Sequence, residues 1–496
     1  MINKFYIKNR NLVFLFLSFI PILVLLLSYN GKLLGNDFWW HIKVGEWICD
    51  NKALPVNDMF SWYGIENNLE WCSQEWLSGV IFYLVFLGTG EIGVYLFCVL
   101  LAVFLLLSII INNFKYIKNR LLFSLIFLLM IAVCFPCFMY GRPQIFSGIL
   151  LYYEIRILYA FYKNPQSKIV FCIPIIAVLW SNLHGGTAVL SYLLCVLFLA
   201  TAIKPFMGYR VINPRKNRRF FIILSVVTVM TVCGIFVNPY GSFVFMYPYE
   251  NITDGYMQSV ILEWFAPDIK VIAQLFVYFI PFILSFLFMV LSKKRVCFVD
   301  FVLFLLFIYM FLRSVRFAYF AYIVISVFIF KYFPKVNIKV GKIGTLLSAG
   351  MVCCLCGYTI LSSIPKLLSN NIIKKVLDTS YCELIKSDNP NRLFNDYNYG
   401  EALIFNDIYV FVDAREDLYA SNILEDSINL LSLQNTKKTS SVFEPEAVIE
   451  KYQFDAILIQ SNRPLRAYLD SHRDKYEKVM SDKNTAYYHV LKYYSK

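Results

Sequence analysis

Long apolar runs recur along this chain as far as residue 363, and they constrain its fold more than any other feature. A helix that crosses a membrane needs about 20 mostly apolar residues, and runs of that kind predict about eleven crossings. We place the crossings at residues 11–29, 91–111, 121–136, 144–162, 169–181, 184–203, 220–237, 270–292, 296–312, 316–332 and 343–363. Residues 1–363 are therefore predicted to form an all-α polytopic membrane domain.

The charged residues support this prediction and indicate an orientation. The chain is 59% apolar and only 16% charged, yet its net charge is +13. The basic residues lie in short blocks between apolar runs, such as Arg210–Arg219 and Lys331–Lys342. Blocks of this kind mark cytoplasmic loops and explain the excess charge without nucleic acid as a partner. We expect a multi-pass protein of the cytoplasmic membrane, with a cytoplasmic N-terminus and an extracytoplasmic C-terminus.

Residues 30–90 form the first outer loop in this topology. A helix from Asp37 to Ile48 would place Trp40, Val44, Trp47 and Ile48 on one stripe, so we predict an interfacial helix with its tryptophans among the lipid headgroups. The later apolar segment Trp76–Leu87 is too short to cross. We interpret it as a half-inserted helix that returns from the outer loop.

The last part of the chain, residues 364–496, differs in composition and predicts a small extracytoplasmic α/β domain. Short β-rich runs alternate with stretches of helical pattern near residues 444–452 and 464–472. The β-rich runs are Arg392–Asn395, Val410–Asp413, Ala456–Ile459 and Ala486–Val490.

The polar residues that interrupt the apolar pattern gather at the outer ends of the predicted crossings. Only Glu154 and Arg156 fall inside a crossing, where they would form either an ion pair or part of a polar pathway. Transporters place polar sites near the membrane midplane, so this distribution counts against a transporter or flippase. The outer set is Asp37, His41, Glu75, Arg142, Gln144, Asn182, His184, Asn238, Glu263, Arg313 and Arg316.

Acidic residues in the first outer loop are candidates for catalysis. Asp37 could accept a proton from an acceptor hydroxyl, and His41, one helical turn away, could orient it or tune its pKa. Glu75 is a further acid in the same loop. Asp37 could equally be the N-cap of an ordinary interfacial helix, since Asp is a favoured cap residue.

Cations at the outer ends of crossings are candidates for binding phosphate. Arg142 could bind a phosphate in a bidentate manner, or it could extend to the interface as a basic anchor. His184 precedes Gly185-Gly186, where the backbone could approach a ligand closely or simply turn. Arg313 and Arg316 lie in one short turn and need an anionic partner: a lipid headgroup, a ligand phosphate or an outer carboxylate such as that of Glu263.

Other polar residues are candidates for substrate binding. Gln144, Asn182 and Glu263 neighbour the cations. In the C-terminal segment, Asp413 and Arg415 could bind a sugar, or they could form a salt bridge at the junction of a strand and a helix.

Metal and redox chemistry have little support in the sequence. Cys49 and Cys72 share the outer loop and could pair, but the thirteen cysteines form no disulfide framework. No zinc-ligand spacing and no phosphate-cradling glycine loop is present, so no cofactor is predicted.

Several motifs of this chain resemble bacterial membrane proteins of the GT-C glycosyltransferase superfamily, in a poorly characterised branch. The resemblance extends over nearly the whole sequence. It rests on Asp37-Phe-Trp-Trp-His41, Gly45-Glu-Trp, Pro55-x-x-Asp58-x-Phe-Ser61, Glu75-Trp-Leu, Gly141-Arg-Pro-Gln144, Asn182-Leu-His-Gly-Gly186, Asn238-Pro-Tyr-Gly241, Glu263-Trp-x-x-Pro-Asp268, Tyr399-Gly-Glu-Ala-Leu-Ile404 and Val412-Asp-Ala-Arg-Glu-Asp-Leu-Tyr419.

The resemblance implies a glycosyltransferase that moves a sugar from a polyprenyl-phosphate donor to a glycan or protein acceptor. Asp37 matches the catalytic acid in the first outer loop of that superfamily. The residue before it is Asn36, so the chain lacks an adjacent acid pair, and a divalent metal is not supported. Asp58 or Glu75 could supply the second acid. A catalytically inactive protein that binds lipid-linked glycans is the alternative.

Overall fold

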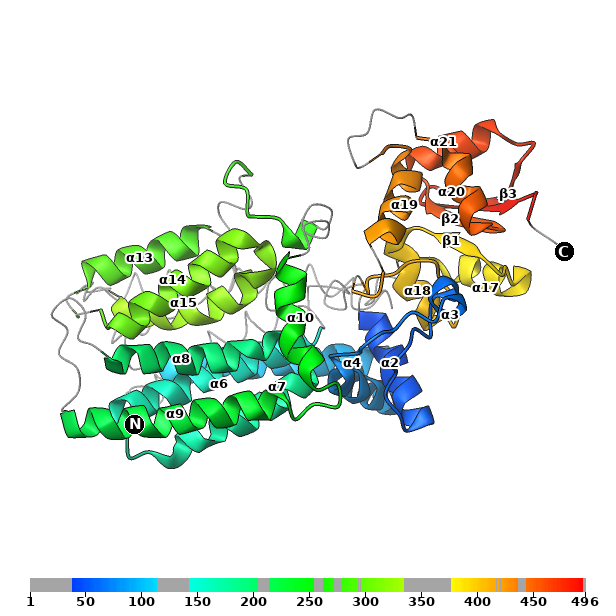
Figure 1. Cartoon of the computed structure of the whole chain (residues 1–496). Helices are drawn as coiled ribbons and strands as arrows, with labels where there is room; N and C mark the ends of the chain where they lie inside the picture. The colour runs from blue at the N-terminus through cyan, green and yellow to red at the C-terminus, as the bar shows by residue number, and fades with distance from the viewer. Residues whose placement is uncertain are drawn as a thin grey trace, which may run out of the picture. The chain divides into compact units, whose positions relative to one another are not determined.

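The computed structural model divides into two compact units (Figure 1). One unit, here named the helical unit, lies within residues 89–373, together with residues 1–33. The other combines Leu34–Gly88 with Lys374–Lys496 and is here named the composite unit. The structure describes residues 38–113, 142–203, 214–253, 262–271, 279–292, 294, 296–333, 376–415, 417–419, 421–435 and 443–493.

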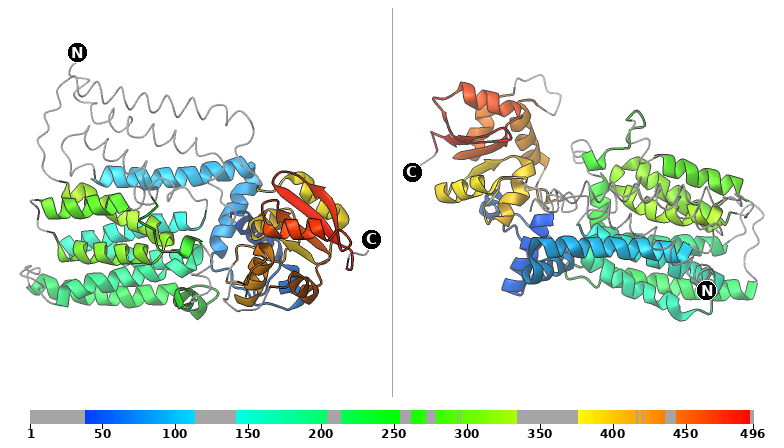
Figure 2. Two further views of the ribbon diagram at one scale, coloured as in Figure 1. Left: turned by 90° about the horizontal axis from the view of Figure 1, so that it is seen from above. Right: turned by 180° about the vertical axis from the view of Figure 1, so that it is seen from behind.

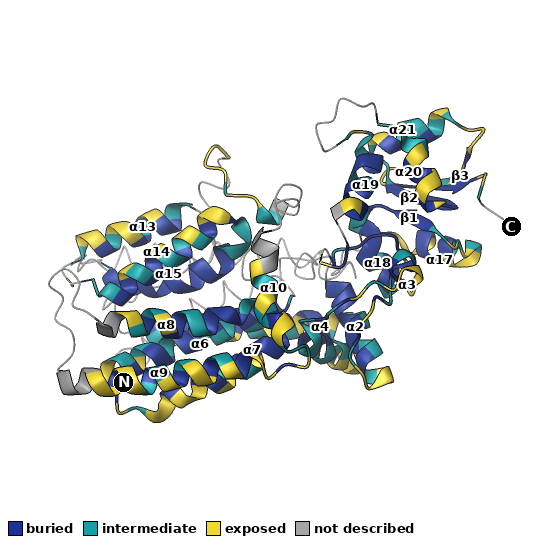
Figure 3. Ribbon diagram, viewed as in Figure 1, coloured by how far each residue is buried: buried dark blue, intermediate teal, exposed yellow. Residues whose placement is uncertain are grey.

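The helical unit is a bundle whose longer helices run alongside one another, whereas α10 (Ser242–Thr253) runs across them (Figures 1 and 2). Within it α7 contacts α9, α8 contacts α6 and α9, and α15 contacts α6, α13 and α14. Every residue of α15 except Lys331 is buried, so this helix forms the centre of the bundle (Figure 3). The α-helices are α6 (Gln144–Lys163), α7 (Ile173–Leu183), α8 (Val189–Ile203), α9 (Pro214–Ile235), α10 (Ser242–Thr253), α13 (Ile280–Leu291), α14 (Phe298–Arg313) and α15 (Ala318–Tyr332). Short 3-10 helices are η1 (Lys168–Cys172), η2 (Gly185–Thr187), η3 (Leu262–Trp264) and η5 (Val315–Phe317).

The outward surface of the bundle is apolar, as expected for a protein surrounded by lipid. On α9, Ile222, Val226 and Val229 are exposed, and Ile175 and Leu179 are exposed on α7. A soluble surface avoids contiguous apolar side chains of this kind. The chain is therefore a membrane protein that is mostly helical.

Among the described residues, four helices are long and apolar enough to cross a membrane, rather than the eleven expected. They are Trp76–Asn113, Gln144–Lys163, Arg218–Ile235 and Val315–Tyr332. Three shorter apolar helices also fall on predicted crossings: Lys168–Leu183, Gly185–Ala200 and Ile280–Leu291. The predicted crossings at 11–29, 121–136 and 343–363 lie outside the described residues.

The helix α4 (Trp76–Asn113) joins two segments that were predicted separately. Its backbone leaves the helical conformation at Gly90, where φ is 66° and ψ is −167°. Only glycine adopts this combination readily. The break lies at the boundary between the two units, since Gly88 ends the first segment of the composite unit.

The composite unit contains the predicted α/β fold. Its four-stranded sheet has the order β1-β2-β4-β3, with β1 parallel to β2 and the other pairs antiparallel. Ala456–Ile459 of the central strand β2 are all buried, which explains their unbroken apolar sequence. The strands are β1 (Leu393–Asn395), β2 (Ala456–Gln460), β3 (Tyr476–Ser481) and β4 (Thr485–Val490), and the helices of this segment are α17 (Thr379–Asp388), α18 (Gly400–Phe405), α19 (Ser421–Ser432), α20 (Pro445–Tyr452) and α21 (Pro464–Ser471).

Two of the β predictions differ from the structure. Strand β3 was not predicted, because only Tyr476 is buried and the other residues of the strand show no alternation of buried and exposed positions. The run Val410–Asp413 is not a strand; Val410 forms an isolated parallel bridge with Ser61 of the first loop.

The first loop packs into the composite unit through α2 (Phe38–Asn51) and α3 (Trp62–Glu66). Helix α2 contacts α18, and the ring centroids of Trp39 and Phe405 lie 4.5 Å apart. Trp62 Nε1 donates to the Leu393 carbonyl at 3.0 Å. The prediction that α2 places Trp40 among lipid headgroups is wrong, because Trp40 and most other residues of this helix are buried in protein.

Candidate functional site

The start of α6 organises the polar residues of the helical unit. Arg142 directly precedes this helix, Pro143 occupies the N-cap position, and no side chain caps the helix there. The positive end of the helix dipole therefore lies beside Arg142 and Gln144, which favours an anion.

An ion-pair cluster occupies this position. Arg142 Nη1 donates to both carboxylate oxygens of Glu263, each at 3.1 Å. Arg316 also acts on Glu263: burial raises the pKa of that carboxyl, but the charges of Arg142 and Arg316 outweigh burial and hold the pKa below its usual range. The Arg142 side chain is 15% exposed and that of Glu263 is 42% exposed, so solvent reaches the cluster.

Backbone contacts hold the two short segments that carry these residues together. Ser314 Oγ donates to the Glu263 carbonyl at 2.8 Å, and the Val315 amide donates to the Phe265 carbonyl at 3.0 Å. The Arg316 guanidinium carbon lies 4.9 Å from the centroid of the Trp264 ring, a cation–π distance. Arg316 is therefore fixed on the side of Glu263.

Arg313 differs from Arg316 although both belong to the same turn. It ends α14 with its side chain exposed, and among the described residues it makes no ion pair. Of the anionic partners that the sequence offered, the carboxylate of Glu263 is the one on which the charge of Arg316 acts.

His184 lies against the first turn of α6. Its Nδ1 is 2.7 Å from Ser147 Oγ, and Trp180 Nε1 donates to Ser147 Oγ at 2.8 Å and to Thr187 Oγ1 at 2.9 Å. His184 is 5% exposed. This network fixes the imidazole, and the sequence did not reveal it, although Trp180 and Thr187 flank the motif.

The beginning of α15 approaches the same turn of α6. A Cβ atom on Gly148 would overlap Tyr319 Oη, so only glycine allows this approach. Arg142, Gln144, His184, Glu263 and Arg316 thus belong to one end of the bundle.

Asn182 has a structural position next to this cluster. Its Nδ2 donates to the carbonyls of Val178 at 2.7 Å and Val237 at 2.8 Å. Asn238 Nδ2 donates a hydrogen bond to the Ser181 carbonyl at 2.6 Å. The two asparagines join the end of α7 to the turn after α9.

The predicted intramembrane pair of Glu154 and Arg156 does not form. Arg156 Nη2 donates to Asn112 Oδ1 at 3.0 Å, whereas Glu154 is fully buried near Ser191 and Cys195. The two residues are two positions apart in α6, so their side chains leave different faces of the helix.

In the composite unit, His41 and Glu75 are brought together. His41 Nε2 lies 3.3 Å from Glu75 Oε2, and the side chains are 3% and 14% exposed. The pair forms because α2 and α4 cross at Gly45 and Gly79, one helical turn beyond His41 and Glu75. A Cβ on Gly45 would overlap the Gly79 carbonyl, and one on Gly79 would lie 2.8 Å from the His41 carbonyl. Asp37 lies outside the described residues.

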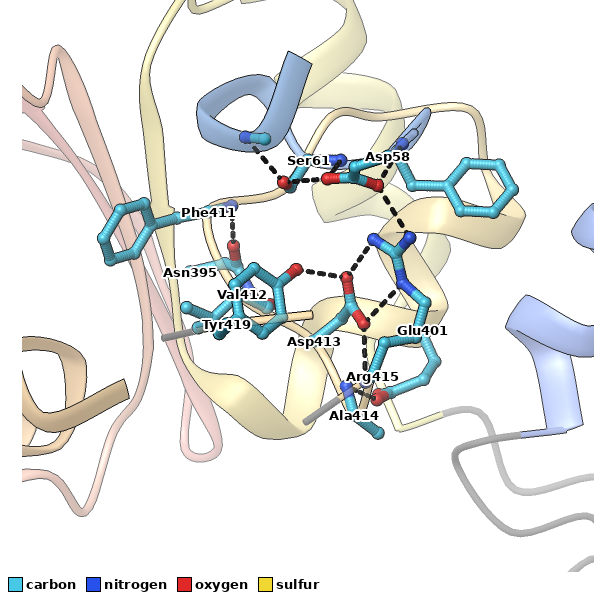
Figure 4. A network of polar contacts seen from close by, with 12 residues as sticks. Asp58, Ser61, Asn395, Glu401, Phe411, Val412, Asp413, Ala414, Arg415 and Tyr419 are labelled. Atoms are coloured by element: carbon cyan, nitrogen blue, oxygen red, sulfur yellow. Dashed lines mark hydrogen bonds and ion pairs between the residues drawn. The ribbon is translucent and has the colours of Figure 1, made fainter. Parts of the chain in front are cut away.

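Arg415 forms the centre of a buried network in the composite unit (Figure 4). Its Nη1 donates to Asp58 Oδ1 at 2.7 Å, and its Nε and Nη2 donate to the two oxygens of Asp413 at 2.9 and 2.7 Å. Tyr419 Oη also donates to Asp413, at 2.6 Å. All three charged side chains are 0% exposed.

The surroundings of Asp58 complete this network. The amides of Phe60 and Ser61 donate to its carboxylate at 3.0 and 3.1 Å, and Ser61 Oγ bonds to it as well. Burial raises the pKa of the Asp58 carboxyl, but Arg415 and these hydrogen bonds outweigh burial and hold it below its usual range. Asp413 and Arg415 therefore form a buried ion pair, and Asp58 joins this pair through Arg415.

Neither cysteine of the first loop forms a disulfide. Cys49 and Cys72 are both free thiols. Within the described ranges, no group of three or more His, Cys, Asp or Glu side chains could hold a metal ion.

The sequence matches no family model and no curated protein. Among solved structures, the chain is similar to the crystal structure of the Archaeoglobus fulgidus oligosaccharyltransferase in its apo form. The TM-score is 0.51 at 11% sequence identity, over 91% of this chain and 70% of that chain. The likeness shows that the two chains share an overall fold.

Proposed function

We propose that this protein is a membrane glycosyltransferase that moves a sugar from a polyprenyl-phosphate donor to an extracytoplasmic glycan or protein. One observation carries the proposal. In a fold like that of an oligosaccharyltransferase, Arg142 and Arg316 both act on one anion, the carboxylate of Glu263, at the uncapped N-terminus of α6. Two guanidinium groups at a helix N-terminus suit the phosphate that leaves as a sugar is transferred. Location in the cytoplasmic membrane, with an inner N-terminus and an outer C-terminal α/β segment, completes this proposal.

The residues take different roles in the proposed reaction. Arg142 and Arg316 bind the donor phosphate, and His184, fixed by Ser147, adds a hydrogen bond or a positive charge. Cations fixed in advance stabilise a leaving phosphate more than mobile water does. Asp37 accepts the proton of the acceptor hydroxyl, while the His41–Glu75 pair fixes the helix that follows Asp37. Asp413 and Arg415 maintain the composite unit.

Replacing Asp37 with Asn tests the catalytic role. Loss of a proton-transfer group typically lowers a rate by about 10² to 10⁴. Membranes that contain the variant should transfer sugar from labelled polyprenyl-phosphate donors at a rate lower by that factor, while donor binding is retained. Transfer equal to wild type would show that Asp37 is not the base.

Replacing Arg316 with Ala tests the phosphate role, with Arg313→Ala as the matched control from the same turn. The first variant should bind the donor at least tenfold more weakly, because it removes a charge fixed beside the anion position. The second should change binding less than threefold at physiological salt, since its exposed charge is screened. Equal losses in both variants would contradict the assignment.

A binding protein without catalysis is the second candidate. Asn36 precedes Asp37, and Asp58 is engaged with Arg415, so neither supplies a second acid next to Asp37. This candidate would be favoured if donor binding requires Arg142 but wild-type membranes transfer no sugar under any acceptor condition.

A further inference from the structure

The anion position at the start of α6 is filled by the chain itself. Both oxygens of Glu263 accept from Arg142 Nη1, and Arg316 is close enough to lower the pKa of the same carboxyl. A carboxylate in this place has the charge sign and the hydrogen-bonding capacity of one face of a phosphate. The carboxylate of Glu263 therefore occupies the position where these cations would bind another anion.

A phosphate cannot simply join this cluster. A prenyl-linked phosphate carries one negative charge while the sugar is attached and up to two after the sugar has left. It would lie within a few ångströms of Glu263, and like charges at that distance repel one another strongly outside bulk water. The ligand and the carboxylate therefore compete for Arg142.

The Glu263 side chain can leave while its backbone remains in place. Ser314 Oγ holds the Glu263 carbonyl, and the Val315 amide holds that of Phe265, so the peptide chain is fixed. The side chain is 42% exposed, and its flexible stem lets the carboxylate turn toward solvent. Arg316 remains over Trp264 when the carboxylate turns away.

We propose that Glu263 is an internal competitor that occupies the anion site of Arg142 and Arg316 until a prenyl-linked phosphate displaces it. The inference rests on the phosphate site of the proposed function. It adds a resting state in which the carboxylate of Glu263 occupies the anion position, and this state would reject weakly bound anions such as free phosphate or acidic headgroups. Discrimination against a wrong ligand by an opposing interaction is a common device.

The full-length protein in detergent, titrated with farnesyl phosphate, tests the proposal. Glu263→Gln should bind this probe about two- to fivefold more tightly than wild type, because an exposed ion pair contributes modestly. Glu263→Asp retains the charge on a shorter stem, and its affinity should lie between the two. In an Arg142→Ala background, the Gln substitution should no longer tighten binding.

Two results would overturn the proposal. If Glu263→Gln binds farnesyl phosphate as weakly as wild type or more weakly, the carboxylate positions Arg142 instead of competing for it. If Glu263→Gln tightens binding equally without Arg142, the competition does not take place at this site.

The proposed function can fail separately. If the protein shows this pattern of affinities but transfers no sugar, the role of Glu263 as a competitor stands and the proposed glycosyltransferase activity is wrong. If no variant binds farnesyl phosphate, both the proposed phosphate site and the competitor role of Glu263 are wrong.

Discussion

Two arginine clusters of the same chemical type occur in different units and differ in their exposure. Arg415 has 0% exposure and donates to Asp58 and Asp413, which are equally buried. Arg142 is 15% exposed and donates to Glu263, whose side chain is 42% exposed. The first cluster is closed by its own hydrogen bonds, whereas the second faces solvent.

This difference in exposure indicates that the Arg415 cluster has a structural role and that the Arg142 cluster can bind a ligand. A buried charge is costly unless every partner is present, so removing one member of the Arg415 cluster should unfold the unit around it. An exposed ion pair adds little to stability and can exchange its partner. Exposure rather than residue type therefore identifies which arginine is available to a phosphate.

Replacing Arg415 with Met should produce the largest effect on stability. It would leave two buried carboxylates without their cation, and loss of one partner from a buried pair costs about 3–5 kcal/mol. Thermal unfolding of the purified full-length protein should show it. Lys451→Met is the control, since its pair with Asp426 is exposed and should matter by less than about 1 kcal/mol. Equal effects would remove the distinction between the clusters.

Replacing Gly45 with Ala should come next. The added Cβ would overlap the Gly79 carbonyl, and overpacking of this kind costs about 1–3 kcal/mol. Separation of α2 from α4 should also break the His41–Glu75 pair and lower the transfer rate. Gly88→Ala is the control, because a Cβ there meets no atom within 4 Å. A neutral Gly45→Ala variant would show that the crossing is wider than described.

Acid should destabilise the composite unit through Asp58. Its folded-state pKa is below the unfolded value, so the unfolded chain takes up a proton first as the pH falls. The stabilisation is complete above the unfolded pKa of about 4 and is lost as the pH falls below it, through the folded pKa. Unfolding followed across pH 3 to 6 should show this loss in wild type and a weaker one in Asp58→Asn. A wild-type profile without any loss would indicate that Arg415 does not control this carboxyl.

Replacing Arg142 with Ala should produce the smallest effect on stability. The lost ion pair is partly exposed and is worth about 0–1 kcal/mol. Donor binding should nevertheless fall by at least tenfold, because the charge lies at the anion position. A variant that unfolds like Arg415→Met would place Arg142 among the structural arginines.

The sequence predicted the class of fold because apolar length and charge asymmetry act locally. The helical pattern of α20 and α21 and the apolar run of β2 were visible for the same reason. The pairing of Asp58 with Arg415 was not visible, because a pairing across most of the chain leaves no mark in any local pattern. Gly45 and Gly79 did carry a signal, since a glycine inside a helical pattern often marks close packing.

The candidate site was predicted in part. The sequence offered Glu263 as one of several anionic partners for Arg313 and Arg316, and in the structure the charge of Arg316 acts on Glu263. It could not show that Arg142 uses the same carboxylate, because that contact depends on how η3 folds against the start of α6. The roles of Asp37, His41 and Glu75 in catalysis stay predictions.

The pairing of Asp58 with Arg415 also bears on how the protein is made, because 357 positions separate the two residues. A ribosome completes the first loop well before it reaches Leu393, which accepts a hydrogen bond from Trp62, and Arg415, which binds Asp58. During that interval the loop has no partner in the finished part of its own unit. Correct assembly is therefore a late event that depends on the last quarter of the chain, and a truncated copy would keep an apolar, tryptophan-rich loop exposed to chaperones and proteases.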